Sequence, residues 1–261
     1  MTTQTAAAIK PQVLAQGVRI LAAWTTLGLA TAGLAATPSA DTLLKDADRA
    51  RGSTSTGIIW RAVMDTVDDG TKTSVTYELK VKGDLAVTET IAPPENKGEY
   101  FVSKERNLWF IKPGMKRAVV ISARQKLMGP ASNADIVATN YYRDYNGKIT
   151  GEAKIDGVDC YTLDLTAKAK NVTYSGIHYW ISKADHLGLK AEFLSLKGDV
   201  IKTTTFKYAN KLVVDGKTTP FVSAMAIADP AKPANSAVVK IEPPKLEAIP
   251  DDAFDIAKLK K

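Results

Sequence analysis

The sequence predicts a mainly β domain in which antiparallel strands form a sandwich or a barrel. From Ser53 onward, apolar and polar residues alternate with a period of two, as they do on strands with one buried face. Turn signals such as Asp-Gly and Asn-Gly recur about every 8–12 residues, which is typical of short antiparallel strands. The chain of 261 residues is long enough for one large β domain behind an N-terminal segment.

That N-terminal segment has the composition of a secretory signal. Residues 1–40 contain no acidic residue and two basic ones, Lys10 and Arg19. An apolar run follows Arg19, and small residues then dominate up to Ala40. We expect a cleavable signal peptide over residues 1–36 and a single domain over residues 37–261. An uncleaved membrane anchor is the alternative, although a stable span needs about 20 strongly apolar residues.

The charge of the chain is mildly basic. Its formal net charge is +7, and loss of Lys10 and Arg19 with the signal leaves two positive charges fewer, hence +5. Such a charge favours an anionic membrane surface or head group and is far from that of a nucleic-acid-binding domain.

The first element after the signal is predicted to be a helix. It begins near Ala40 with Asp41 as its N-cap, has Arg49 and Arg51 in its last turn, and ends just before Gly52. One apolar stripe on this helix comprises Leu43, Leu44, Ala47 and Ala50.

Strands are predicted over most of the remaining chain, with one long interruption. Turn signals include Asp68–Gly70, Asn146–Gly147 and Asp156–Gly157. Residues 113–141 are loop-rich, with a short helix expected at 133–139, and such a break is typical of a lid or binding loop. The last residues, 250–261, suggest a short helix or a docking tail. The predicted strands are 57–65, 74–82, 84–91, 100–103, 108–112, 118–121, 148–155, 158–167, 174–182, 187–196, 199–208, 211–214, 219–228 and 236–242.

The motifs of common catalytic and metal sites are absent from the sequence. The two histidines, His178 and His186, are not spaced as zinc ligands, and neither a nucleophile elbow nor a phosphate-binding loop occurs. The single cysteine, Cys160, lies in an alternating strand pattern and is expected to be a small buried side chain. We therefore expect no catalysis, no cofactor and no metal.

Three stretches carry a resemblance to a known family. They are Leu108-Trp-Phe-Ile-Lys-Pro-Gly-Met-Lys-Arg117, Gly157-Val-Asp-Cys-Tyr-Thr-Leu-Asp-Leu165 and Tyr179-Trp-Ile-Ser-Lys-Ala-Asp185. In this order and spacing, over roughly residues 53–256, the chain resembles LolA-like outer-membrane lipoprotein-sorting proteins. The closer likeness is to an uncharacterised branch often associated with lipid-exporting transporters. One departure is the stretch 129–136, which lacks the aromatic residue found in many relatives.

The resemblance implies a curved antiparallel sheet that forms an incomplete, half-open barrel. A few short helices would cover its cavity, and acyl chains would bind in the apolar hollow between sheet and helices without a cofactor. Alternation and side-chain size nominate residues that line this hollow, and ordinary core packing is the alternative for each. The nominated residues are Ile58, Trp60, Met64, Tyr77, Leu79, Phe110, Met115, Phe193, Phe206 and Met225.

A basic stretch near the predicted loop is a second candidate site. It could contact an anionic head group, a membrane surface or an acidic partner, and a solvated loop is the alternative. Its members are Lys112, Lys116, Arg117 and Arg124.

These observations together predict a periplasmic carrier that is monomeric after cleavage of the signal. It would bind a lipid or a lipoprotein acyl chain and shuttle it toward the outer membrane without catalysis. Its partners would be an inner-membrane exporter and an outer-membrane acceptor, with no nucleic acid. The alternative is a lipid-sensing or envelope-assembly module that acts through protein–protein contacts.

Overall fold

The computed structural model describes residues 1–2, 37–104, 106–122, 135, 140–214 and 216–260. The expected signal peptide therefore lies outside the described residues apart from Met1 and Thr2, and the helix expected at 133–139 is described only at Asp135. The chain divides into two units, residues 1–37 and 38–261, and the described helices and strands all belong to the second. None of the helices among the described residues has the length and apolar character needed to cross a membrane.

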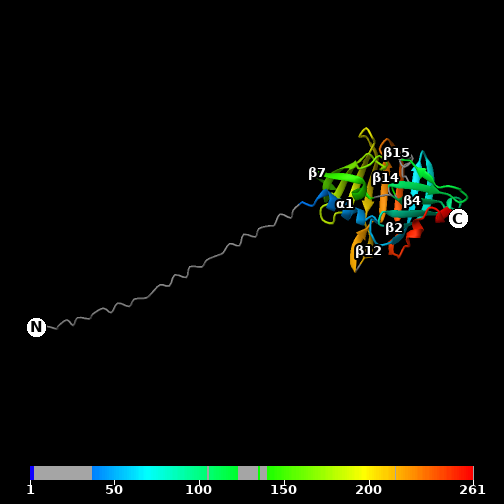
Figure 1. Cartoon of the computed structure of the whole chain (residues 1–261). Helices are drawn as coiled ribbons and strands as arrows, with labels where there is room; N and C mark the ends of the chain where they lie inside the picture. The colour runs from blue at the N-terminus through cyan, green and yellow to red at the C-terminus, as the bar shows by residue number, and fades with distance from the viewer. Residues whose placement is uncertain (3–36, 105, 123–134, 136–139, 215, 261) are drawn as a thin grey trace. The chain divides into compact units, whose positions relative to one another are not determined.

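The second unit is built on one antiparallel sheet that curves around its own inner face (Figure 1). Its strand order is β6-β5-β4-β3-β2-β1-β15-β14-β11-β10-β9-β8-β7, with β16 beside β1, and because the order ends at β6 and β7 the barrel stays open. This confirms the predicted mainly β fold and incomplete barrel. The strands are β1 Ile58–Asp68, β2 Thr71–Lys82, β3 Leu85–Ala92, β4 Tyr100–Lys104, β5 Asn107–Ile111, β6 Val119–Ile121, β7 Tyr145–Ile155, β8 Val158–Ala167, β9 Gly176–Ser182, β10 Gly188–Leu194, β11 Val200–Lys207, β12 Asn210–Val214, β13 Lys217–Phe221, β14 Ala224–Asp229, β15 Lys232–Ile241 and β16 Lys245–Leu246.

Two-residue turns join several of these strands. Between β1 and β2 the backbone of Asp69 has φ 45° and that of Gly70 has φ 83°. Two successive residues in the left-handed region match the twist of the flanking strands, which is why Asp-Gly is a strong hairpin signal. The same arrangement joins β7 to β8 at Asp156 and Gly157.

Two predicted boundaries are wrong. The Asn146–Gly147 pair is not a turn but lies inside β7, where it pairs with residues of β8. A Cβ at position 147 would lie 3.0 Å from Cδ1 of Leu44, so glycine leaves room there for the helix that packs over the strand. The strand expected at 219–228 is two strands, β13 and β14, because β13 leaves the main sheet to form a separate hairpin with β12.

Helix α1, Ala40–Arg49, packs its apolar stripe onto the inner face of the sheet. Its N-cap is Ser39, whose hydroxyl accepts a hydrogen bond from the backbone N–H of Thr42, so the expected capping role of Asp41 is wrong. Asp41 instead occupies the first turn. A second short helix, α3 Tyr141–Asp144, was missed by the sequence analysis and immediately precedes β7.

The C-terminal segment covers part of the outer face of the sheet. The 3₁₀ helices η3, Asp251–Phe254, and η4, Lys258–Lys260, follow β16, and a third, η1, is Pro94–Asn96. Ile249 and Phe254 are buried against Val87, Val102 and Ile111 of β3, β4 and β5. The predicted tail is therefore a packed part of the fold.

Candidate ligand-binding site

The inner face of the sheet is a continuous apolar surface whose rows follow from the strand register. Met64 of β1 lies opposite Val239 of β15, which in turn lies opposite Met225 of β14 and then Phe206 of β11. Since paired residues share a face, these four side chains form one row across four strands. All four belong to the main buried cluster, together with the stripe of α1.

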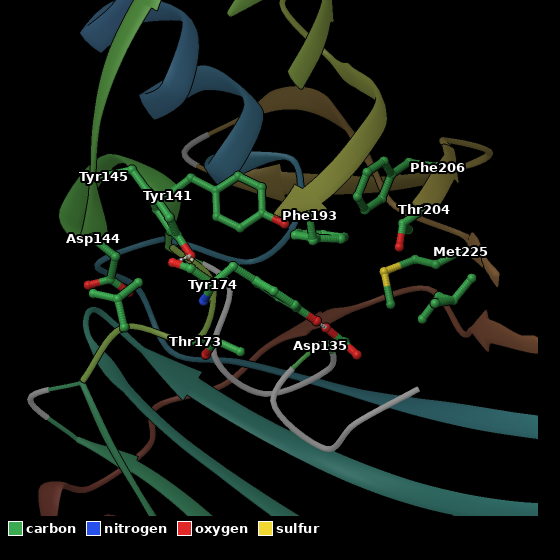
Figure 2. A pocket seen from close by; sticks show the side chains of 12 residues that line it. Asp135, Tyr141, Asp144, Tyr145, Thr173, Tyr174, Phe193, Thr204, Phe206 and Met225 are labelled. Carbon is green, nitrogen blue, oxygen red and sulfur yellow. Dashed lines mark hydrogen bonds between the residues drawn. The ribbon is translucent and has the colours of Figure 1, made fainter. Parts of the chain in front are cut away.

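A pocket lies in this inner face, between the sheet and the segments near α3 (Figure 2). Its free volume is about 20 Å³, which holds one water molecule. An acyl chain would therefore have to take the place of side chains that now fill the hollow. The lining residues are Asp135, Tyr141, Asp144, Tyr145, Val172, Thr173, Tyr174, Phe193, Thr204, Phe206, Met225 and Ile227.

Three of the ten nominated cavity residues, Phe193, Phe206 and Met225, line this pocket. Five others lie in the same buried cluster without reaching the pocket, and one of them, Trp60, meets Phe221 edge-on at 5.5 Å between ring centroids. The nominated residues in this second group are Ile58, Trp60, Met64, Tyr77 and Leu79.

The last two nominated residues lie apart from the pocket. Phe110 faces inward, but it belongs to a smaller cluster with Phe101, 5.1 Å away between ring centroids, and Leu108. Met115 is half-buried in the loop after β5. Phe110 is thus on the inner face, separated from β2 by β3 and β4, while Met115 is on no strand.

The nominated basic residues do not gather at the pocket. Lys112, Lys116 and Arg117 are exposed in the loop before β6, and Lys112 forms an ion pair of 3.1 Å with Glu99. Arg124 lies outside the described residues. None of the three described residues is among those that line the pocket.

Polar groups that sequence reasoning did not single out lie at and beside the pocket: Asp135 and Tyr174 line it, and Lys202, which is not one of its lining residues, pairs with Asp135. Lys202 Nζ lies 2.7 Å from Oδ2 of Asp135, and both side chains are buried. The hydroxyl of Tyr174 donates a short hydrogen bond to Oδ1 of the same carboxylate. Burial, reinforced by the charge of Asp135, holds the pKa of Tyr174 well above its ordinary value, so this hydroxyl is a donor. One signal was available: Lys202 alternates with Thr204 and Phe206 on a strand.

A second buried ion pair anchors the end of α1. Nη2 of Arg51 lies 2.6 Å from Oδ1 of Asp48, and its guanidinium lies over the ring of Tyr141, 4.0 Å from the centroid. Burial raises the pKa of Asp48, and the charge of Arg51 opposes that shift. Oδ2 of Asp48 also accepts the backbone N–H of Tyr142 at 2.7 Å, so this pair joins α1 to α3.

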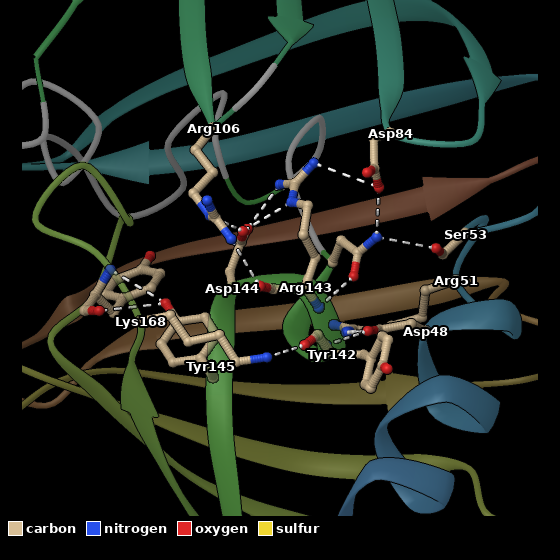
Figure 3. Close-up of polar contacts among 12 residues, drawn as sticks. Asp48, Arg51, Ser53, Asp84, Arg106, Tyr142, Arg143, Asp144, Tyr145 and Lys168 are labelled. Carbon is tan, nitrogen blue, oxygen red and sulfur yellow. Dashed lines mark hydrogen bonds and ion pairs between the residues drawn. The ribbon is translucent and has the colours of Figure 1, made fainter.

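Helix α3 is held from several sides by polar contacts (Figure 3). The carboxylate of Asp144 accepts hydrogen bonds from Arg106, in the β4–β5 turn, at 2.9 Å, and from Arg143 at 2.7 Å. The side-chain amide of Asn140 donates to Asp84, in the β2–β3 turn, at 3.0 Å. These contacts join the tips of two hairpins to the segment that borders the pocket.

The two histidines and the cysteine lie on different parts of the fold. In the part of the chain that the structure describes, no group of three His, Cys, Asp or Glu side chains is placed to hold a metal ion. His178 pairs with Asp164 and His186 with Asp46, on different parts of the fold. Cys160 is buried, and burial raises the pKa of its thiol.

Comparison with solved structures identifies the class of fold. A LolA superfamily protein from Nitrosomonas europaea matches with a TM-score of 0.74 and 26% identity, covering 85% of this chain and 100% of that one. A putative outer-membrane lipoprotein-sorting protein domain from Vibrio parahaemolyticus matches with a TM-score of 0.71 and 21% identity, covering 85% and 98%. A DUF1329 family protein from Desulfovibrio piger gives 0.70 and 22%, with the same coverage.

These similarities, together with the open curved sheet, define a LolA-like fold and confirm the family resemblance. A family model described as an uncharacterized protein matches residues 82–261, and the chain belongs to that family. A search of curated proteins found no match.

Proposed function

We propose that this protein is a periplasmic carrier that shelters the acyl chain of a lipid or lipoprotein and delivers it toward the outer membrane without catalysis. The observation that carries the proposal is the apolar inner face of an open sheet, with a pocket lined by Phe193, Phe206 and Met225. This pocket is bordered by α3 and the segment before β9, which are not part of the sheet.

The energetics of such a site suit a carrier. Burying an aliphatic chain contributes about 0.8 kcal/mol for each methylene removed from water. Because the free volume is about 20 Å³, the chain must first displace side chains that are already buried. Part of the gain is offset by that displacement, so binding is reversible, as delivery requires. The flexible side chain of Met225 adapts to such exchange.

The proposed location rests on two supports. One is the expected signal peptide over residues 1–36, with its basic, apolar and small-residue order. The other is the similarity to a putative outer-membrane lipoprotein-sorting domain. An exporter in the inner membrane and an acceptor at the outer membrane are the partners that this function requires.

Native mass spectrometry of protein purified gently from a periplasmic fraction tests the proposal. We expect a bound lipid in the wild type and its loss in Phe206→Trp, which adds bulk to the pocket. Val213→Trp is the matched control, because Val213 is exposed on β12, and it should retain the lipid. Thermal unfolding checks that each variant is folded.

Transfer to acceptor vesicles separates a carrier from a sensor. A carrier releases its lipid to vesicles, whereas a sensor or assembly module retains it. A folded wild-type protein that is empty and also rejects added lipids would contradict the proposed function.

A further inference from the structure

Lys202 is a cation on the apolar inner face of the sheet. On β11, Lys202, Thr204 and Phe206 alternate as buried residues, while Thr205 and Lys207 are exposed. The strand register sets Lys202 opposite Phe193 of β10, which lines the pocket. The side chain of Lys202 is only 4% exposed, so its ammonium group needs a compensating partner inside the protein.

That partner comes from outside the sheet. Asp135 lies far from β11 in sequence. Its carboxylate accepts hydrogen bonds from both the ammonium of Lys202 and the hydroxyl of Tyr174. The ring of Tyr174 in turn stacks on Phe193, with 4.2 Å between centroids, which fixes the position of its hydroxyl. Figure 2 shows the carboxylate of Asp135 beside Tyr174, at the pocket.

The two donors define the chemistry that this place recognises. An ammonium group and a donating phenol both supply protons for hydrogen bonds, so their natural partner is an acceptor-only anionic oxygen. A chain that enters the pocket must displace some of the side chains that fill it, and Asp135 is one of them. If Asp135 moves away, the buried charge of Lys202 requires another anion.

We propose that Lys202 and Tyr174 form the head-group site of the pocket, and that the carboxylate of Asp135 occupies this site when no ligand is bound. The ligand is an aliphatic chain that ends in an anionic oxygen group, a carboxylate or a phosphate. This inference rests on the proposed carrier function and deepens it, because it states which kind of amphiphile the hollow prefers.

The outer surroundings of Lys202 favour an anion that arrives with a chain. Lys202 and Tyr174 both line an open groove, whose rim carries four carboxylates and one other lysine. These carboxylates repel a small free anion that approaches from the groove, whereas a head group that arrives with a chain in the pocket meets Asp135 and Tyr174, beside Lys202. The charged residues of the rim are Asp68, Asp69, Asp199, Asp229 and Lys232.

Binding of three probes to the delipidated protein tests the inference. The probes are hexadecanoate, 1-hexadecanol and phosphatidylglycerol, each in competition with a fluorescent fatty-chain reporter. We expect the wild type to prefer hexadecanoate over hexadecanol by about tenfold, the size of one charge-assisted hydrogen bond. Lys202→Met should abolish this preference, so that hexadecanoate and hexadecanol bind with similar affinity. Lys207→Met, on the exposed side of the same strand, is the matched control and should keep it.

A second variant keeps the test decisive if Lys202→Met fails to fold. Asp135→Asn removes the internal carboxylate that competes with the ligand, so it should strengthen hexadecanoate binding several-fold without strengthening hexadecanol binding. If the Lys202–Asp135 ion pair served only the fold, Asp135→Asn would change the affinities for hexadecanoate and hexadecanol equally. That result, or a wild type without head-group preference, would overturn the inference.

The outcomes also separate this inference from the proposed function. Binding of hexadecanol without any preference for hexadecanoate would support the carrier function and contradict the head-group site. If the protein binds none of the chains, both the carrier function and the head-group site are contradicted. Preference for hexadecanoate alone identifies a free fatty acid as the class of ligand, and preference for phosphatidylglycerol identifies a phospholipid head, both of which support the anionic site.

Discussion

The hydroxyl of Tyr179 occupies the space that a side chain at position 188 would need. A Cβ built on Gly188 would lie 1.7 Å from Oη of Tyr179 and 2.3 Å from its Cζ. Tyr179 is fully buried at the centre of β9, while Gly188 begins β10. The glycine therefore allows a large aromatic ring to pack on the inner face of the sheet.

Gly188→Ala should destabilise the protein through this contact. The ring of Tyr179 must shift within a packed core, and overpacking of this kind costs about 1–3 kcal/mol. Chemical denaturation measures the change. Gly151→Ala is the control, because the nearest atom to a Cβ there is Oγ1 of Thr162 at 3.3 Å, at the end of a small side chain. Equal effects of the two substitutions would contradict the steric argument.

Arg51→Met should be strongly destabilising because it leaves a buried carboxylate without its partner. Both side chains of the Asp48–Arg51 pair are 2% exposed, and breaking such a pair costs about 3–5 kcal/mol. The double variant Asp48→Asn with Arg51→Met should recover much of this loss, since Asn retains an oxygen that can accept the N–H of Tyr142. Denaturant titration of both variants checks this, and no recovery in the double variant would argue against an uncompensated charge.

Leu44→Ala should weaken the packing of α1 on the sheet. Leu44 is completely buried, and loss of a leucine side chain from such a site costs about 2–5 kcal/mol. Leu246→Ala serves as the comparison because that side chain is 46% exposed, and we expect a change below about 0.5 kcal/mol. Thermal unfolding of both variants tests the difference, which would disappear if α1 did not contribute to the core.

Ser74→Ala should change the pH dependence of stability through Asp65. A hydrogen bond from Ser74 at 2.7 Å is the main cause that lowers the pKa of Asp65 below its ordinary value of 3.8, and Lys240 adds to it. A lowered pKa in the folded state contributes stability above the unfolded pKa, and this stability is lost as the pH falls through the folded pKa. The difference in melting temperature between wild type and variant should therefore be present at neutral pH and shrink below about pH 4. A carboxyl NMR titration of Asp65 should show its pKa rising in the variant.

Three of the twelve residues that line the pocket were nominated from the sequence, and the polar residues of the site were not. Phe193, Phe206 and Met225 were nominated from alternation and size, and they line the pocket. Lys202 lies on the same strand face as Phe206, but lysine side chains are almost never fully buried unless they are paired, so the residue type alone does not indicate a buried site. Its partner, Asp135, is 67 residues away, in a stretch without strand periodicity, so no local pattern joins the two.

The sequence by itself determined the strands, most turns and the apolar stripe of α1, because these depend on short-range rules. Side chains alternate across a strand, Asp-Gly adopts left-handed turns, and a helix repeats every 3.6 residues, so a few neighbouring residues suffice to reveal each element. Tertiary structure alone decided that Asn146–Gly147 continues a strand, because these residues pair with Thr166 and Leu165 of β8. It also decided the Asp135–Lys202 and Asp48–Arg51 pairs, because burial of a charge depends on which distant segments enclose it.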